Sequence, residues 1–224
     1  MGQVIHRIPP SRIDPQRRAA DRALLLTRIA TGLAHEGKNP LHNMVLHLQL
    51  MAEKLQQPER GGSPVEKHLA AIRDGIGRVD HLLKAFGDFA APEHLPPDLA
   101  AAAQRAVQLF AYEARRASVQ VALAAPAEQL VKSESRDLGD LVAHALVACL
   151  ESARDGGKVQ LLVQPRGAEV HFEARAEGGR GNREAAVPHL AAARRLAPEA
   201  ACELSIETPP AGGVRLSLSF SQPR

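Results

Sequence analysis

Apolar residues recur at steps of three and four along the first long segment of the chain, residues 14–55. The repeat positions are Leu26, Ala30, Leu33, Gly37, Leu41, Met44, Leu48, Met51 and Leu55. Strict alternation of such steps is typical of a coiled-coil seam, and a departure from it changes the local winding. The alternation is broken at Gly37, so the pattern predicts one long helix whose seam changes character between Gly37 and Pro40.

A second apolar series follows a short segment rich in helix breakers, residues 56–64. Ser63 and Pro64 fit the N-cap and the first position of the next helix. The apolar positions of that helix are Val65, Leu69, Ile72, Ile76, Val79, Leu83 and Phe86. Because a short connection makes two helices antiparallel neighbours, the pattern predicts a hairpin. A lone hairpin cannot bury both seams, so we expect a homodimer with a four-helix bundle. Packing on the C-terminal half of the same chain is the alternative.

The pattern changes to mixed α and β after a proline-rich linker at residues 92–97. Helices are expected near residues 98–116, 137–153 and 184–196. Strands are expected near residues 119–123, 159–163, 170–176, 204–206 and 214–220, and the alternation of Val170, Phe172, Ala174 and Ala176 with polar residues is typical of half-buried antiparallel strands. The predicted fold class is therefore α+β: an antiparallel two-helix hairpin, then an α/β sandwich with helices on one face of the sheet. The expected units are a tail (1–15), the hairpin (16–92) and the sandwich (93–224).

The composition of the chain argues against nucleic acids and membranes as binding partners. The chain has 45% hydrophobic and 24% charged residues, and 28 basic against 25 acidic residues give a net charge of +3. No Lys/Arg block concentrates this charge, and aromatic residues make up only 3%, so we expect no nucleic-acid partner. No apolar stretch approaches the roughly 18 residues of a membrane span, and we expect no membrane partner. Cys149 and Cys202 are far apart in apolar surroundings, which favours a reducing, cytoplasmic location.

The candidate chemical centre is the run Leu33-Ala-His35-Glu36-Gly37-Lys38-Asn39-Pro40-Leu41. It resembles the H-box of sensor histidine kinases, a His-Glu-x-x-Asn-Pro run midway along the first helix of their dimerisation and phosphoacceptor domain. The resemblance implies that His35 accepts a phosphoryl group. His35 lies two positions from both Leu33 and Gly37, so we expect its side chain to point off the seam into solvent. A neutral imidazole can attack a phosphoryl group directly.

The neighbours of His35 have expected roles in the same chemistry. Glu36 can hold the proton of the other ring nitrogen, and Asn39 lies one turn further on, where it can orient a water against a phosphoaspartate. Asn39 also occupies the place where a metalloprotease helix would carry its second histidine, which excludes that class. Glu36 and Asn39 are therefore the catalytic candidates beside His35.

Three further residues are candidates for contact with a receiver domain. Lys38 supplies a positive charge, and Pro40 removes a backbone hydrogen bond and, with Gly37, weakens the helix, which suggests a bend there. His42 lies two turns beyond His35 and has no acidic neighbour following it, so we expect a solvated histidine. The expected receiver-contacting residues are Lys38, Pro40 and His42.

The C-terminal half resembles the ATP-binding domain of the same kinases in the order of its elements, but its nucleotide-binding residues differ. The resemblance places Ala148 where a magnesium-binding asparagine belongs, with His144 one turn earlier. The run Glu177-Gly-Gly-Arg-Gly181 is superficially similar to the Asp-x-Gly-x-Gly motif of the family, whose aspartate contacts adenine. In the alternation of the strand, however, Ala176 and not Glu177 faces the side on which that aspartate would lie. Residues 182–190 run almost directly into the next helix and leave no nucleotide lid. We therefore expect no nucleotide or metal bound by this chain, and Mg²⁺ only in the partner receiver.

The leading hypothesis is a histidine phosphotransferase that relays phosphoryl groups between response-regulator receiver domains through His35, without ATP. Two alternatives remain open. One is a histidine kinase with a divergent nucleotide site, and the other is a non-catalytic pseudokinase that binds receivers or a kinase.

Overall fold

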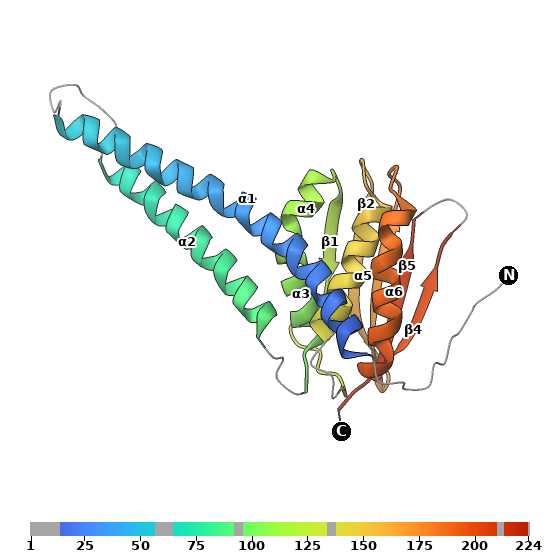
Figure 1. The fold of residues 1–224 in the computed structure, drawn as a ribbon. Helices are drawn as coiled ribbons and strands as arrows, with labels where there is room; N and C mark the ends of the chain where they lie inside the picture. The colour runs from blue at the N-terminus through green and yellow to red at the C-terminus, as the bar shows by residue number, and fades with distance from the viewer. Residues whose placement is uncertain (1–13, 57–64, 92–95, 134–137, 210–212, 224) are drawn as a thin grey trace.

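The computed structural model describes residues 14–56, 65–91, 96–133, 138–209 and 213–223. Two long helices, α1 (Pro15–Gln56) and α2 (Val65–Ala90), extend away from an α/β unit (Figure 1). They are antiparallel, because His47 contacts His68 near one end and Arg22 donates to the carbonyl of Phe89 near the other. The expected hairpin is confirmed. The predicted cap at Ser63 and Pro64 lies outside the described residues.

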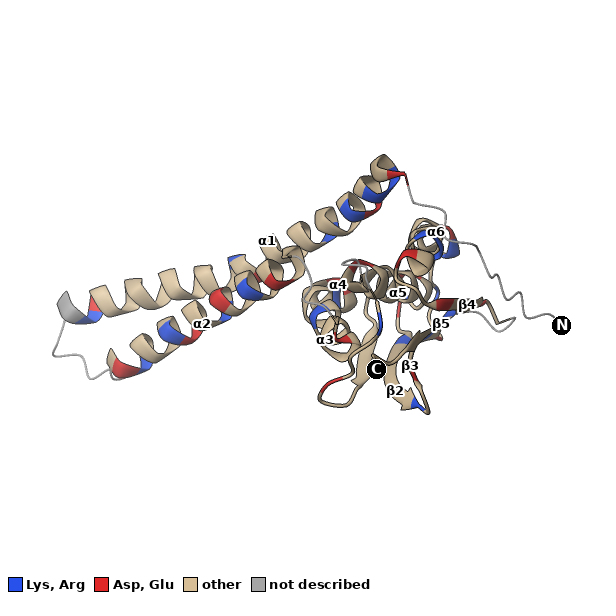
Figure 2. Cartoon of the chain, turned by 90° about the horizontal axis from the view of Figure 1, so that it is seen from below, with Lys and Arg blue, Asp and Glu red and all other residues tan. Residues whose placement is uncertain are grey.

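Helix α1 remains continuous through Pro40. Figure 2 shows that it changes direction along its length and reaches from the tip of the hairpin to α5 and α6. Midway along the hairpin the two helices approach closely, since a Cβ atom added at Gly75 would lie 2.6 Å from Cγ of Met44.

The first turns of α1 pack on the C-terminal unit as well as on the end of α2. Leu25 and Ile29 are fully buried there, while Ala30, a predicted seam position, is exposed. The seam prediction is wrong for Ala30, whereas Leu26 and Leu33 are half-buried against the core as expected. The helices of the C-terminal unit determine which face of α1 is covered. The predicted alternative, packing on the chain's own C-terminal half, therefore occurs for this end of the hairpin.

The C-terminal unit contains five strands in the order β1-β2-β3-β5-β4. They are β1 (Gln120–Ala124), β2 (Lys158–Arg166), β3 (Glu169–Glu177), β4 (Glu203–Glu207) and β5 (Arg215–Ser221). Strand β1 is parallel to β2, and the other neighbours are antiparallel. The buried residues of β3 alternate with half-buried ones as expected, and Val170, Phe172, Ala174 and Ala176 are the buried set. The α+β fold class is confirmed.

The helices of this unit cover one face of the sheet (Figure 1). They are α3 (Leu99–Leu109), α4 (Ala111–Arg116), α5 (Leu138–Ser152) and α6 (Arg183–Glu199). The prediction of a single helix over residues 98–116 is wrong, because the backbone turns at Phe110, which separates α3 from α4. Asp98 caps α3 by accepting from the backbone N–H groups of Ala100 and Ala101.

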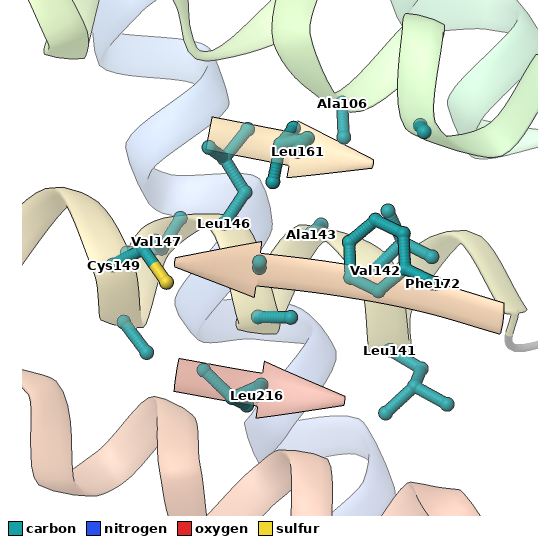
Figure 3. Packing of buried hydrophobic residues seen from close by; sticks show 14 of the residues in the cluster. Ala106, Leu141, Val142, Ala143, Leu146, Val147, Cys149, Leu161, Phe172 and Leu216 are labelled. Carbon is teal, nitrogen blue, oxygen red and sulfur yellow. The ribbon is translucent and has the colours of Figure 1, made fainter. Parts of the chain in front are cut away.

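Helix α5 is the centre of the core, and all of its residues are buried. Its apolar residues pack against the sheet, where Leu141, Val142 and Leu146 lie near Phe172 and Leu161 (Figure 3). A helix that is buried on every side needs partners for its polar residues as well.

Ion pairs with α1 supply two of these partners. One guanidinium nitrogen of Arg22 on α1 donates to both carboxylate oxygens of Asp140, and Arg28 donates to Glu151. Burial raises the pKa of Asp140, and the adjacent Arg22 opposes that shift. A third ion pair joins Asp21 of α1 to Arg195 of α6. Helix α1 is therefore bound to the α/β unit by charge pairing as well as by Leu25 and Ile29.

Candidate functional site

His35 lies midway along α1, and its side chain is exposed as expected. Its imidazole is also stacked on the ring of Tyr112 in α4, with ring centroids 4.9 Å apart and planes 7° apart. The histidine therefore has one ring face against the C-terminal unit while the side chain as a whole remains open to solvent.

Glu36 is directed at the same short helix. Its carboxylate forms an ion pair with Arg115 of α4. In this conformation the Glu36 carboxylate therefore binds the guanidinium of Arg115. Its role as proton partner of the His35 imidazole stays a prediction.

A groove of about 710 Å³ lies between α1, α2 and Arg115, and it is lined by Glu36, the residue after His35, but not by His35 itself. Asn39 is exposed at this groove, while Pro40 is buried and contributes to its floor. The other lining residues are Glu36, Asn43, Arg73, Asp74, Gly77, Arg78, His81, Leu82 and Arg115. Three arginines and two carboxylates among these residues make the groove polar and rich in cations. Such a surface suits an acidic partner.

Lys38 and His42 are exposed residues of the same part of α1, and neither lines the groove. The structure thus brings Glu36, Asn39 and Pro40 together at one groove, with Lys38 and His42 on the exposed surface of α1. Their expected roles in phosphoryl transfer and receiver contact stay predictions.

The residues that the resemblance places at a nucleotide site are buried. Ala148 on α5 has no exposed surface. Ala176 is buried and pairs with Val159, whereas Glu177, the next residue, forms an ion pair with Arg175. The side chains of Ala148 and Ala176 offer no acidic or amide group to a metal ion or to a purine.

His144, one turn before Ala148, forms a buried pair with His189 of α6, with the two Nδ1 atoms 2.9 Å apart. Burial lowers the pKa of His144 to about 4, with a further contribution from Arg195. Burial, followed by His144 and Arg28, lowers the pKa of His189 to about 3. Both imidazoles are therefore neutral at pH 7, and the pair fills the space between α5 and α6.

In the part of the chain that the structure describes, no group of three or more His, Cys, Asp or Glu side chains is arranged to hold a metal ion. None of the described helices combines the length and apolar character needed to cross a membrane.

Tyr112 and Arg115 are site residues that the sequence analysis did not find. They follow the His-Glu pair by more than seventy positions, and residues 98–116 were expected to form one helix. Tyr112 is the only tyrosine of the chain, but nothing in its local sequence indicates a contact with His35.

No protein-family model matches this chain. The chain is 29% identical over 150 residues to the two-component sensor PprA of Pseudomonas aeruginosa. The matched region is 66% of this chain but only 16% of that protein.

Several solved structures are similar in fold at low sequence identity. A bacterial phosphotransferase covers 94% of this chain and 100% of its own, with 14% identity and a TM-score of 0.48. The Acinetobacter baumannii histidine kinase AdeS covers 82% and 98%, with 12% identity and a TM-score of 0.48. The cytoplasmic segment of histidine kinase QseC covers 66% and 95%, with 18% identity and a TM-score of 0.45. The sequence relation to a two-component sensor, taken with the α+β fold and the His-Glu-x-x-Asn-Pro run, identifies a histidine-kinase-related core in this chain.

Proposed function

We propose that this chain relays phosphoryl groups between receiver domains of response regulators, with His35 as the residue that is phosphorylated in between. The observation that carries the proposal is the exposed position of His35 midway along α1. The next residue, Glu36, lines a groove that contains three arginines. An acceptor that another protein must reach needs this kind of exposure.

The proposed reaction is a nucleophilic substitution at phosphorus. One imidazole nitrogen attacks the phosphoryl group of a receiver's aspartyl phosphate, the P–O bond to the aspartate breaks, and the carboxylate leaves. A P–N bond forms, which leaves a positive charge on the imidazole ring. The proton on the other ring nitrogen then passes to solvent, and the ring of phosphohistidine becomes neutral. The reverse steps on a second receiver complete the relay. The receiver supplies the Mg²⁺ and the acidic pocket.

The charges around His35 match such a partner. Arg73, Arg78 and Arg115 line the groove, and Lys38 is exposed one turn from His35. These cations can meet the acidic pocket of a receiver and steer its approach. Asp74 and Glu36 lie among them and would oppose a partner docked in the wrong register.

Homodimerisation of the hairpin is part of the proposal. Leu41, Leu48, Ile76 and Leu83 are predicted seam residues, and each is between 51% and 62% exposed in the single chain. Exposed apolar side chains repeated along both helices form the kind of patch that marks an interface. A second copy of the hairpin would cover it with the same residues.

The buried Ala148 and Ala176 support a relay that does not use ATP. The related core alone does not separate a phosphotransferase from a kinase, so the deciding experiment offers both kinds of phosphoryl donor. The purified chain is incubated with aspartate-phosphorylated receiver domains and, separately, with labelled Mg-ATP.

The expected result is acid-labile, base-stable phosphate on the chain from receivers and none from ATP. The label should be absent from His35→Gln and present in His171→Gln, which alters a histidine of strand β3 in the sheet. Label from ATP would favour the kinase alternative, and no label from either donor would favour a non-catalytic binding protein.

A further inference from the structure

Three residues of the short helix α4 contact α1. Tyr112 stacks on His35, Glu113 accepts a hydrogen bond from Arg28, and Arg115 pairs with Glu36. The α1 partners are spaced by seven and eight residues from Arg28, which places them on one face of a helix. Helix α4 therefore lies along the face of α1 that carries the acceptor histidine.

The contact extends over the turn before His35. Gly32 is buried, and a Cβ atom added there would lie 3.7 Å from Cβ of Tyr112, an ordinary packing distance. The tyrosine is thus packed against the backbone of α1 and is itself held in place. A fixed ring can restrict the movement of the imidazole that stacks on it.

The geometry of the stack restricts rotation without closing access. Parallel rings whose centroids are 4.9 Å apart are offset, and such aromatic contacts are favourable beyond the area they bury. Tyr112 covers one ring face of His35, whereas the attacking nitrogens lie at the ring edge. His35 remains exposed, which favours a positioning role for Tyr112 over a blocking one.

We propose that Tyr112 is a positioning residue for phosphoryl transfer, which holds the His35 imidazole in the orientation that a docked receiver requires. This inference rests on the proposed relay function. An unrestrained histidine has about three staggered χ1 positions and two broad ring orientations. Loss of the stack should therefore lower the fraction of productive complexes about three- to sixfold.

The experiment compares wild type, Tyr112→Leu and Tyr112→Phe with two phosphoryl donors. One donor is an aspartate-phosphorylated receiver, and the other is phosphoramidate, a small molecule that releases ammonia as its P–N bond is replaced by one to the imidazole. Tyr112→Leu should lower the maximal transfer rate from the receiver about three- to sixfold, with the half-saturating receiver concentration unchanged. Labelling by phosphoramidate should stay within about twofold, because a small donor needs no fixed orientation.

Tyr112→Phe keeps the stacked ring and should restore the receiver rate. Circular dichroism melts verify folding, and Tyr112→Met replaces the leucine variant if that variant melts early. Since the chain has one tyrosine and no tryptophan, tyrosine emission reports Tyr112 alone, and it should change in His35→Ala.

An unchanged receiver rate in Tyr112→Leu would overturn the positioning role and leave the relay intact. A faster rate would also overturn it, and would mean that the stack holds His35 back. Loss of rate in Tyr112→Phe would assign the effect to the hydroxyl group instead of the ring. No transfer between wild type and any receiver would overturn the relay and this inference together.

Discussion

The guanidinium of Arg28 donates a hydrogen bond of 2.7 Å to Oε1 of Glu151, which joins α1 to the buried helix α5. The same nitrogen donates to Glu113 of α4 at 3.0 Å. Arg28→Met would remove the shared cation from two buried carboxylates, although Arg154 would still pair with Glu151. We expect the free energy of unfolding, measured by urea titration, to fall by about 2–4 kcal/mol.

A matched control is Arg175→Met. Arg175 pairs with Glu177, and both side chains are 43% exposed. Surface pairs of this kind contribute little, so the loss should stay below about 1 kcal/mol. Similar losses in the two variants would contradict the assignment of Arg28 as the link between α1 and the α/β unit.

The buried pair of His144 and His189 predicts acid sensitivity. Their pKa values are lowered to about 4 and about 3 from an unfolded value of 6.5, so between these limits the unfolded chain binds more protons than the folded chain. Stability is therefore fully present above about pH 6.5 and falls as the pH decreases toward 4. We expect a loss of about 2 kcal/mol for each histidine, about 4 kcal/mol for the pair, between pH 7 and pH 5, measured by urea titration at each pH.

The double variant His144→Leu/His189→Leu provides the control for this pH dependence. Replacing both partners with apolar groups removes the two titrating sites without leaving an unpaired polar atom. Its stability should change less between pH 7 and pH 5 than that of wild type. An equally steep decline would assign the acid sensitivity to other groups.

The proposed dimer predicts a change of molecular mass in Ile76→Glu. Ile76 is 57% exposed on the hairpin, and a glutamate there would place a charge at the centre of the dimer interface. Light scattering at micromolar concentration should give twice the 24.0 kDa chain mass for wild type and a monomer for the variant. Val187→Glu changes a residue of the same exposure on α6 and should remain dimeric. A monomeric wild type would exclude the bundle.

Much of the fold follows from local pattern. The expected helix over residues 14–55 is observed as Pro15–Gln56, because its apolar repeat and the breakers after it act within a few residues. The burial parity of Ala174 and Ala176 was predictable for the same reason, since alternation along one strand determines which side chains face the core.

The contacts that define the candidate site were less predictable. The stack of His35 on Tyr112 and the pair of His144 with His189 join residues that lie far apart in the sequence. Residue patterns within one helix contain no information about such partners. The burial of Leu25 and Ile29 was missed likewise, because docking of α1 on α5 and α6 overrides the hairpin repeat at that end.

Asn39 is expected to assist hydrolysis of a receiver's phosphoaspartate and not the transfer of phosphoryl groups to His35. It is exposed at the groove one turn from His35, where its amide can orient a water against a phosphoaspartate. Asn39→Ala should leave labelling of His35 near the wild-type rate and slow the loss of phosphate from the partner receiver. Asn43→Ala, at the same groove, is the matched control. If Asn39→Ala abolishes transfer as completely as His35→Gln, the two roles are assigned wrongly.

ATP is expected to leave the thermal stability of the chain unchanged. The resemblance places Ala148 at the position of a metal ligand and Ala176 at that of an adenine contact, and both are buried alanines. Loss of two polar interactions, each on the order of 1–3 kcal/mol, would move a micromolar dissociation constant to roughly millimolar. A ligand at its dissociation constant stabilises the fold by less than about 0.5 kcal/mol, against about 2.7 kcal/mol at a hundredfold excess.

The measurement is a thermal melt with millimolar Mg-ATP, with Mg²⁺ alone as the control. Glu177→Ala is measured in parallel, because Glu177 is an acidic residue next to the adenine-contact position and is half-buried beside Arg175. An upward shift of several degrees with Mg-ATP, removed by Glu177→Ala, would mean that the chain binds nucleotide through Glu177 and would favour a kinase. Absence of such a shift would support the proposed relay, in which the phosphoryl group comes from a receiver and no nucleotide is needed.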